Sequence, residues 1–132
     1  MGIADIVHKI IDLGGLNPEY ALRVAQRLQE EKPRWANYEA VGIGLKDLIT
    51  DGLDIETAMN FYFETEEDNG DNYNRGYLAY KRLREGGITP REALIKVKEL
   101  KKIPEGLSLY MTLTSRGLKS DVALTQLLGM AE

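Results

Sequence analysis

The chain has 132 residues, of which 43% are hydrophobic and 29% charged, and its formal net charge is −4. This composition is typical of one soluble globular domain. The chain has no cysteine, which excludes disulfide frameworks, thiolate catalysis and cysteine-ligated zinc. No apolar run approaches the ~20 residues of a membrane span, and the N-terminal residues do not resemble a signal peptide. We therefore expect a cytoplasmic protein without a membrane segment.

Apolar residues recur with helical spacing along most of the chain. The first helix is expected at 3–13, where isoleucine and valine side chains form a wide apolar stripe. Further helices are expected at 18–31, 35–50, 55–64, 73–85, 90–101, 105–115 and 120–130. The stretch 106–114 alternates as a strand would, but its place in a repeat favours a helix. Gly42 and Gly44 inside the third helix indicate a kink or a close helix crossing.

One pattern occurs four times: GLNPEYAL at 15–22, GLDIETAM at 52–59, GITPREAL at 87–94 and GLKSDVAL at 117–124. Each copy starts with glycine and has an alanine six residues later. A glycine at this place is typical of a left-handed helix C-cap, on which the next apolar residue packs. The apolar residues four before each glycine should be buried; they are Ile11, Leu48, Leu83 and Leu113.

A new helix should begin directly after each of these glycines. Asn17, Asp54 and Thr89 suit the N-cap, and Ser120 would serve one residue later in the fourth copy. Pro18 suits the first helical position. The repeat is therefore a helical hairpin, and the expected fold class is all-α. About seven or eight short helices would form four αα-hairpins, as a compact bundle or a short irregular solenoid.

Charge is distributed unevenly along what we expect to be a single helical domain, 1–132. Residues 1–74 carry 15 acidic and 6 basic side chains, whereas residues 75–132 carry 6 acidic and 11 basic ones. The division predicts an acidic half at 1–63, a polar linker at 64–72 and a basic half at 73–132. Solvated helix faces, a basic face for an acidic partner, or head-to-tail homo-oligomerisation would each explain this pattern.

No motif indicates a reaction, a cofactor or a metal. His8 is the only histidine, and its counterparts in the other copies are Leu45, Tyr80 and Tyr110, so we expect a partly buried structural imidazole. The acidic linker fails as a calcium loop: with Gly70 at position six, Gly76 occupies the place of the bidentate glutamate. We expect neither catalytic, cofactor-binding nor metal-binding residues, and thus a protein that is not an enzyme.

The stretch 73–102 is the most suggestive region, because it is rich in basic residues and has tyrosines at helical spacing. Such a surface can contact phosphates or an acidic partner. The candidate contacts are Arg75, Lys81, Arg82, Arg84, Arg91, Lys96, Lys98, Lys101 and Lys102. The turn within it resembles a helix-turn-helix only weakly, and the fourfold repeat explains that turn without DNA.

The sequence is compatible with two candidate functions. The first is a non-enzymatic helical-repeat module for protein–protein interaction, acting as an adaptor or as an inhibitor of a larger assembly. Trp35 is its candidate partner anchor, although a tryptophan at this helix boundary can equally fill the core between hairpins. The alternative is a nucleic-acid-binding regulator that uses the basic hairpin 73–102.

Overall fold

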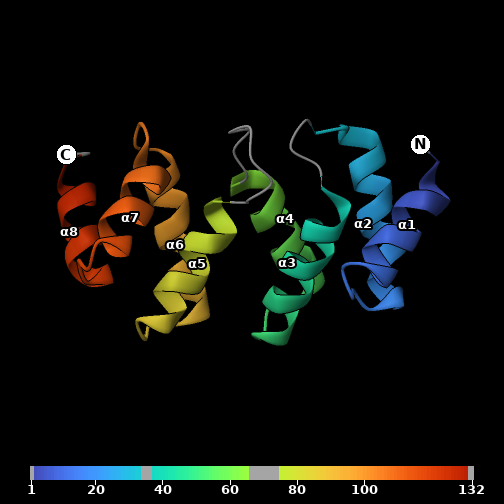
Figure 1. The fold of residues 1–132 in the computed structure, drawn as a ribbon, viewed down its shortest axis with the longest axis horizontal. Helices are drawn as coiled ribbons and strands as arrows, with labels where there is room; N and C mark the ends of the chain where they lie inside the picture. Colours follow the sequence, from blue (N-terminus) through green and yellow to red (C-terminus); the bar gives the residue numbers. More distant parts are fainter. Residues whose placement is uncertain (1, 34–36, 66–74, 131–132) are drawn as a thin grey trace. The chain divides into compact units, whose positions relative to one another are not determined.

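The computed structural model describes residues 2–33, 37–65 and 75–130. Within these ranges every regular element is an α-helix, so the all-α prediction is confirmed, and 106–114 is helical (Figure 1). The helices are α1 (Ile3–Asp12), α2 (Pro18–Glu31), α3 (Tyr38–Thr50), α4 (Ile55–Thr65), α5 (Arg75–Glu85), α6 (Pro90–Lys101), α7 (Gly106–Ser115) and α8 (Ser120–Met130).

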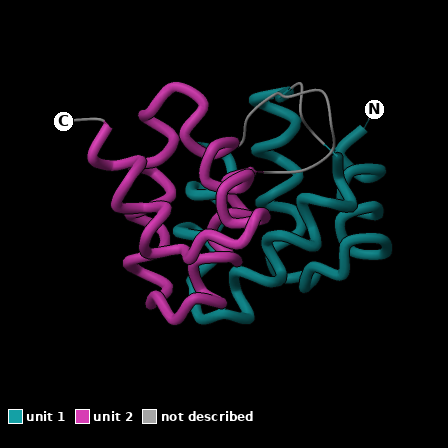
Figure 2. Tube along the Cα trace, turned by 60° about the vertical axis from the view of Figure 1, so that its left-hand side comes forward, with its two compact units in different colours: residues 1–64, 68–73 teal, residues 65–67, 74–132 magenta. Residues whose placement is uncertain are grey.

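The chain forms two compact units, each built from two helical hairpins (Figure 2). Unit 1 contains α1 to α4 up to Glu64, and α1 packs against both α2 and α3. Unit 2 contains Thr65 and α5 to α8. In unit 2, α5 packs against α6 and α7, and α6 and α7 each pack against α8. Each unit buries its own set of apolar side chains, including Leu48 in unit 1 and Leu83 in unit 2.

The four repeated glycines lie two or three residues after the end of a helix, and each has a positive φ angle, as the sequence predicts. The φ angles are 77° at Gly15, 108° at Gly52, 93° at Gly87 and 102° at Gly117. In the last three turns the residue after the glycine donates its N–H to the carbonyl five residues earlier. For example, the Ile88 nitrogen lies 3.1 Å from the Leu83 oxygen. This is the Schellman arrangement, which satisfies carbonyls at the helix end.

The first turn is wider by one residue, and this corrects two expectations. The Leu16 N–H bonds to the carbonyl of Ile10, six residues earlier, at 3.2 Å. Ile10 is therefore fully buried in the place expected for Ile11, which is half-buried. The same shift moves His8 outward: its side chain is 77% exposed and lies 2.9 Å from Asp12. His8 is thus a surface residue and not a partly buried imidazole.

Leu113 in α7 also departs from the predicted burial. It is half-buried, whereas Leu48 and Leu83 at the equivalent positions have no exposed surface. Its carbonyl still accepts the N–H of Leu118 at 3.1 Å. The turn therefore forms in the fourth copy without full burial of the residue that precedes it.

The N-caps are confirmed in three of the four copies. The side chains of Asn17, Asp54 and Thr89 each accept a backbone N–H from the first turn of the following helix. Ser120 does not cap α8, because it is already the first residue of that helix. Its hydroxyl instead accepts a hydrogen bond from the Tyr110 hydroxyl at 3.1 Å. Burial raises the pKa of Tyr110, which remains a hydrogen-bond donor.

The two glycines within α3 allow close contacts, as expected. A Cβ atom on Gly42 would lie 2.7 Å from the Ile10 carbonyl oxygen and 2.8 Å from the Gly14 Cα atom. A Cβ atom on Gly44 would lie 2.5 Å from the ring of Tyr62, which is buried. The absence of a side chain at Gly42 therefore allows α3 to lie close to the end of α1, and its absence at Gly44 makes room for the Tyr62 ring of α4.

Candidate interaction surface

The candidate basic residues all lie in unit 2, but they do not form one common surface. Arg82 in α5 reaches the C-terminal turn of α7. Its Nη1 atom lies 2.7 Å from the Thr114 hydroxyl and 3.0 Å from the Ser115 hydroxyl. It also lies 3.4 Å from the Met111 carbonyl. Because α7 has no basic residue in its last turn, Arg82 supplies the positive charge that this helix end favours.

Two further candidates have partners within their own hairpin. The Arg84 guanidinium donates to the carbonyl of Ile88 at 2.9 Å, in the turn between α5 and α6. The Lys96 ammonium lies 3.7 Å from both Glu92 and Glu99, at four residues before it and three after. This single lysine therefore forms ion pairs with both acidic side chains of α6.

The exposed face of α6 carries a line of cations. Four exposed residues lie on one side of the helix, because they are spaced at intervals of four, three and four residues. They are Arg91, Ile95, Lys98 and Lys102. We call this line, which includes the C-cap residue of α6, the α6 stripe. It extends over about 16 Å and contains no acidic residue.

The acids of α6 lie beside the α6 stripe and not within it. Counted at 100° per residue, Glu92 and Glu99 lie roughly 80–100° around the helix from Arg91. Lys96 lies beyond them and bridges both. The helix surface is therefore divided into a neutralised band and a positively charged line. Ile95, 42% exposed, is the apolar member of that line.

The other candidates are more scattered. Lys81 is exposed, and its ammonium lies 5.4 Å from the centre of the Tyr77 ring. Arg75 and Lys101 are half-buried. Tyr80 is 2% exposed and belongs to the core of unit 2, so it offers no face on which a base could stack. Tyr73 and Trp35 lie outside the described residues, as do residues 66–72 of the predicted linker.

A hollow of about 740 Å³ lies beside the C-terminal end of the α6 stripe. Its apolar lining comes from Ile103 and Pro104 after α6, and from Leu128 and Met130 of α8. Lys102 belongs both to this hollow and to the α6 stripe, and the Lys96–Glu99 pair lines the hollow as well. Met130 is 69% exposed, the most exposed of the large apolar side chains described.

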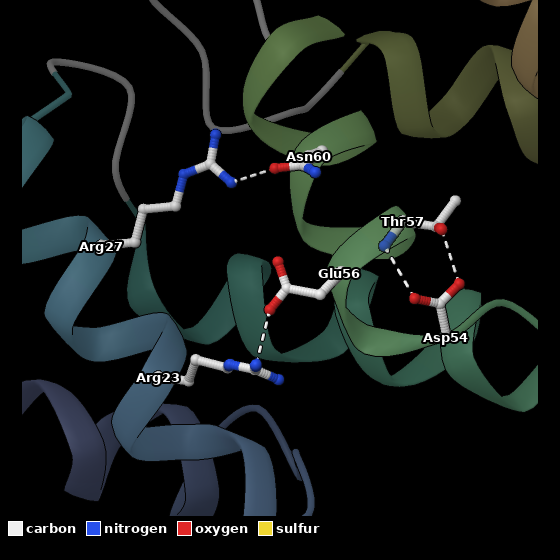
Figure 3. A network of polar contacts seen from close by, with 6 residues as sticks. All are labelled: Arg23, Arg27, Asp54, Glu56, Thr57 and Asn60. Atoms are coloured by element: carbon white, nitrogen blue, oxygen red, sulfur yellow. Dashed lines mark hydrogen bonds and ion pairs between the residues drawn. The ribbon is translucent and has the colours of Figure 1, made fainter.

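Unit 1 contains a polar network that the sequence did not reveal (Figure 3). It joins α2 to α4 through residues more than 30 positions apart: Arg23 lies 2.8 Å from Glu56, and Arg27 donates to the side chain of Asn60. The guanidinium of Arg27 also lies 4.5 Å from the centre of the Phe63 ring. These contacts hold two helices together, so we interpret the network as structural.

The described residues offer few other starting points for chemistry. No described helix is long and apolar enough to cross a membrane. Residues 2–33, 37–65 and 75–130 include no group of three histidine or carboxylate side chains placed to hold a metal ion. Among known proteins, no family model matches the sequence, and neither a curated protein nor a solved structure matches it significantly.

Proposed function

We propose that this chain is a non-enzymatic interaction module that binds an acidic surface of another protein. The observation that carries the proposal is the α6 stripe, where three exposed cations and Ile95 lie on one helix face. As an adaptor or as an inhibitor of a larger assembly, such a module needs only a rigid surface of this kind. The absence of cysteine suits a cytoplasmic location.

The arrangement of charges on α6 is more typical of a helix face that binds a partner than of one that contacts only solvent. In a typical solvated helix, acids and bases alternate and neutralise one another. In α6 both acids pair with Lys96, so the helix itself contributes only cations and Ile95 to the line that runs from Arg91 to Lys102. Complementary charge speeds encounter and selects partners, and the exposed Ile95 adds apolar area to the same contact.

Nucleic acid is the alternative partner, since the same cations could contact phosphates. Two observations favour a protein instead. Arg82, Arg84 and Lys96, three of the candidate phosphate contacts, have partners inside unit 2. Tyr80 is buried, and stacking of bases requires exposed rings.

The test compares binding to an acidic helical peptide, a neutral peptide of equal length, mixed-sequence DNA and RNA. The first variant combines Arg91→Glu with Lys98→Glu. The matched control combines Arg116→Glu with Lys119→Glu, which reverses the same number of charges at exposed positions of the α7–α8 turn. We expect the wild type to bind the acidic peptide, the α6 variant to lose binding, and the control variant to retain it.

Two results would contradict the proposal. The first is equal loss in both double variants, because it would mean that only the overall charge matters. The second is preferential binding of DNA or RNA, with the logarithm of affinity falling against the logarithm of salt with a slope of about −2 to −3. That slope is expected for three phosphate contacts and would establish the nucleic-acid alternative.

A further inference from the structure

The hollow next to the α6 stripe carries a more specific inference about the partner, which rests on the proposed function. Lys102 is the last cation of the stripe and also lines the hollow, so the two features form one continuous surface. A partner that extends along the cations reaches an apolar recess at the C-terminal end of α6. The recess lies among Ile103, Pro104, Leu128 and Met130.

We propose that this surface binds an acidic segment of another protein whose end carries one large apolar side chain, which enters the hollow. The volume of about 740 Å³ falls within the range that proteins use for small ligands and is ample for a leucine, phenylalanine or tryptophan side chain. Charge complementarity selects this occupant, because cations line the route to the hollow and Lys102 belongs to its wall, where Lys96 is already paired with Glu99. A purely apolar partner would offer no counter-charge to Lys102.

The spacing of the cations constrains the acidic segment. Arg91 and Lys98 are seven residues apart, and Lys98 and Lys102 are four apart. A helical partner with glutamates at the same two intervals presents its carboxylates on one face, opposite these cations. The apolar side chain then belongs about one helical turn beyond the glutamate that faces Lys102, because the hollow begins there.

The experiment uses the full-length chain and three synthetic helical peptides of about 20 residues. The first has the glutamate spacing of four and seven and a leucine one turn beyond. The second replaces this leucine by alanine, and the third keeps the composition but scrambles the spacing. Affinities are measured by fluorescence anisotropy at physiological salt, and folding of every variant is checked by circular dichroism.

We expect the leucine peptide to bind about tenfold more tightly than the alanine peptide, as burial of one leucine side chain implies. The scrambled peptide should also bind more weakly than the leucine peptide. Met130→Ser should remove most of the leucine advantage without unfolding the chain, since this side chain is 69% exposed. Leu13→Ser is the matched control: Leu13 is 57% exposed in unit 1, and its replacement should leave both affinities unchanged.

The outcomes separate this inference from the proposed function. Equal binding of leucine and alanine peptides, still lost in Arg91→Glu with Lys98→Glu, would overturn the role of the hollow and leave the α6 stripe in place. Failure of every acidic peptide to bind would overturn both. Sedimentation velocity provides one further check: if the chain self-associates and Met130→Ser abolishes this, a second copy fills the hollow and the inference is wrong.

Discussion

Arg82 illustrates how a single residue can be assigned the wrong role by local sequence. Its position in a basic stretch predicts a contact with phosphate or an acidic partner, yet its guanidinium bonds to Thr114, Ser115 and the Met111 carbonyl of α7. These acceptors are 29 to 33 residues away, so no local pattern reveals them. A charge reversal at Arg82 would therefore disturb packing as well as binding.

We predict that Arg82→Ala destabilises the protein by about 1–2 kcal/mol, because a charged donor and the half-buried acceptors on Thr114 and Met111 lose their hydrogen bonds. Urea denaturation followed by circular dichroism measures this change. Arg91→Ala is the control, because Arg91 is exposed on α6 and its replacement should change the unfolding free energy by less than about 0.5 kcal/mol. Equal effects of the two substitutions would contradict the structural role of Arg82.

Asp54 leads to a prediction about how the stability of the protein depends on pH. Its carboxylate accepts hydrogen bonds from the Thr57 hydroxyl and backbone N–H at the start of α4, and these bonds lower its pKa below the ordinary value of 3.8. A lowered pKa in the folded state means that the unfolded chain takes up the proton more readily. The stabilisation is therefore present above pH 3.8 and is lost as pH falls through the lower, folded pKa.

We expect wild type to be more stable than Asp54→Asn at neutral pH, and this difference to shrink as the pH falls below 3.8. Asparagine keeps a side-chain acceptor at the N-cap but cannot be ionised, so the comparison isolates the charge. Thermal melts of both proteins over a series of pH values measure the difference. A difference that stays constant across the series would show that the carboxylate charge does not contribute.

At the scale of the helical hairpin, the turn glycine is the defining feature. Gly87 has a φ of 93°, whereas the adjacent Gly86 has no positive φ, and a Cβ atom there would meet its nearest neighbour at 3.4 Å. Gly87→Ala should therefore destabilise unit 2 by about 1 kcal/mol, while Gly86→Ala should be tolerated or slightly stabilising. Chemical denaturation of the two single variants compares adjacent glycines directly. A larger loss in Gly86→Ala would contradict the assigned turn geometry.

The helices and turns were predictable because their signals are local. A glycine C-cap followed by a polar N-cap lies within a few residues, and three of the four turns adopt the same hydrogen bonds. The different geometry of the first turn could not be predicted from the sequence, because both Ile10 and Ile11 are apolar and either could face the core. The one-residue shift in this turn then moved His8 to the surface.

The candidate surface was predictable only in part, because some of its features depend on local spacing and others on contacts between helices. Glu92 and Glu99 stand four before and three after Lys96, so the sequence did contain the signal that this lysine is neutralised within its own helix. The spacing of the α6 stripe was likewise available from helical periodicity. The hollow was not, because Leu128 and Met130 come from α8 and meet Ile103 only through the fold of unit 2.

At the scale of the whole molecule, the two units each enclose their own core. Leu48 lies on α3 in unit 1 and Leu83 on α5 in unit 2, and neither side chain has exposed surface. They occupy the same place in the repeat, four residues before a glycine with positive φ. In arrays of hairpins each element depends mainly on its neighbours, so damage in one place need not spread evenly.

We predict that Leu48→Ala and Leu83→Ala each cost about 2–5 kcal/mol, the usual range for removing a buried leucine. The loss should be local, because each cavity weakens the packing of its own unit. Hydrogen exchange read by mass spectrometry separates the cases: Leu83→Ala should speed amide exchange in α5 to α8 more than in α1 to α4, and Leu48→Ala the reverse. Identical acceleration along the whole chain in both variants would mean that the two units unfold as a single cooperative body, and the division into separate cores would then not govern stability.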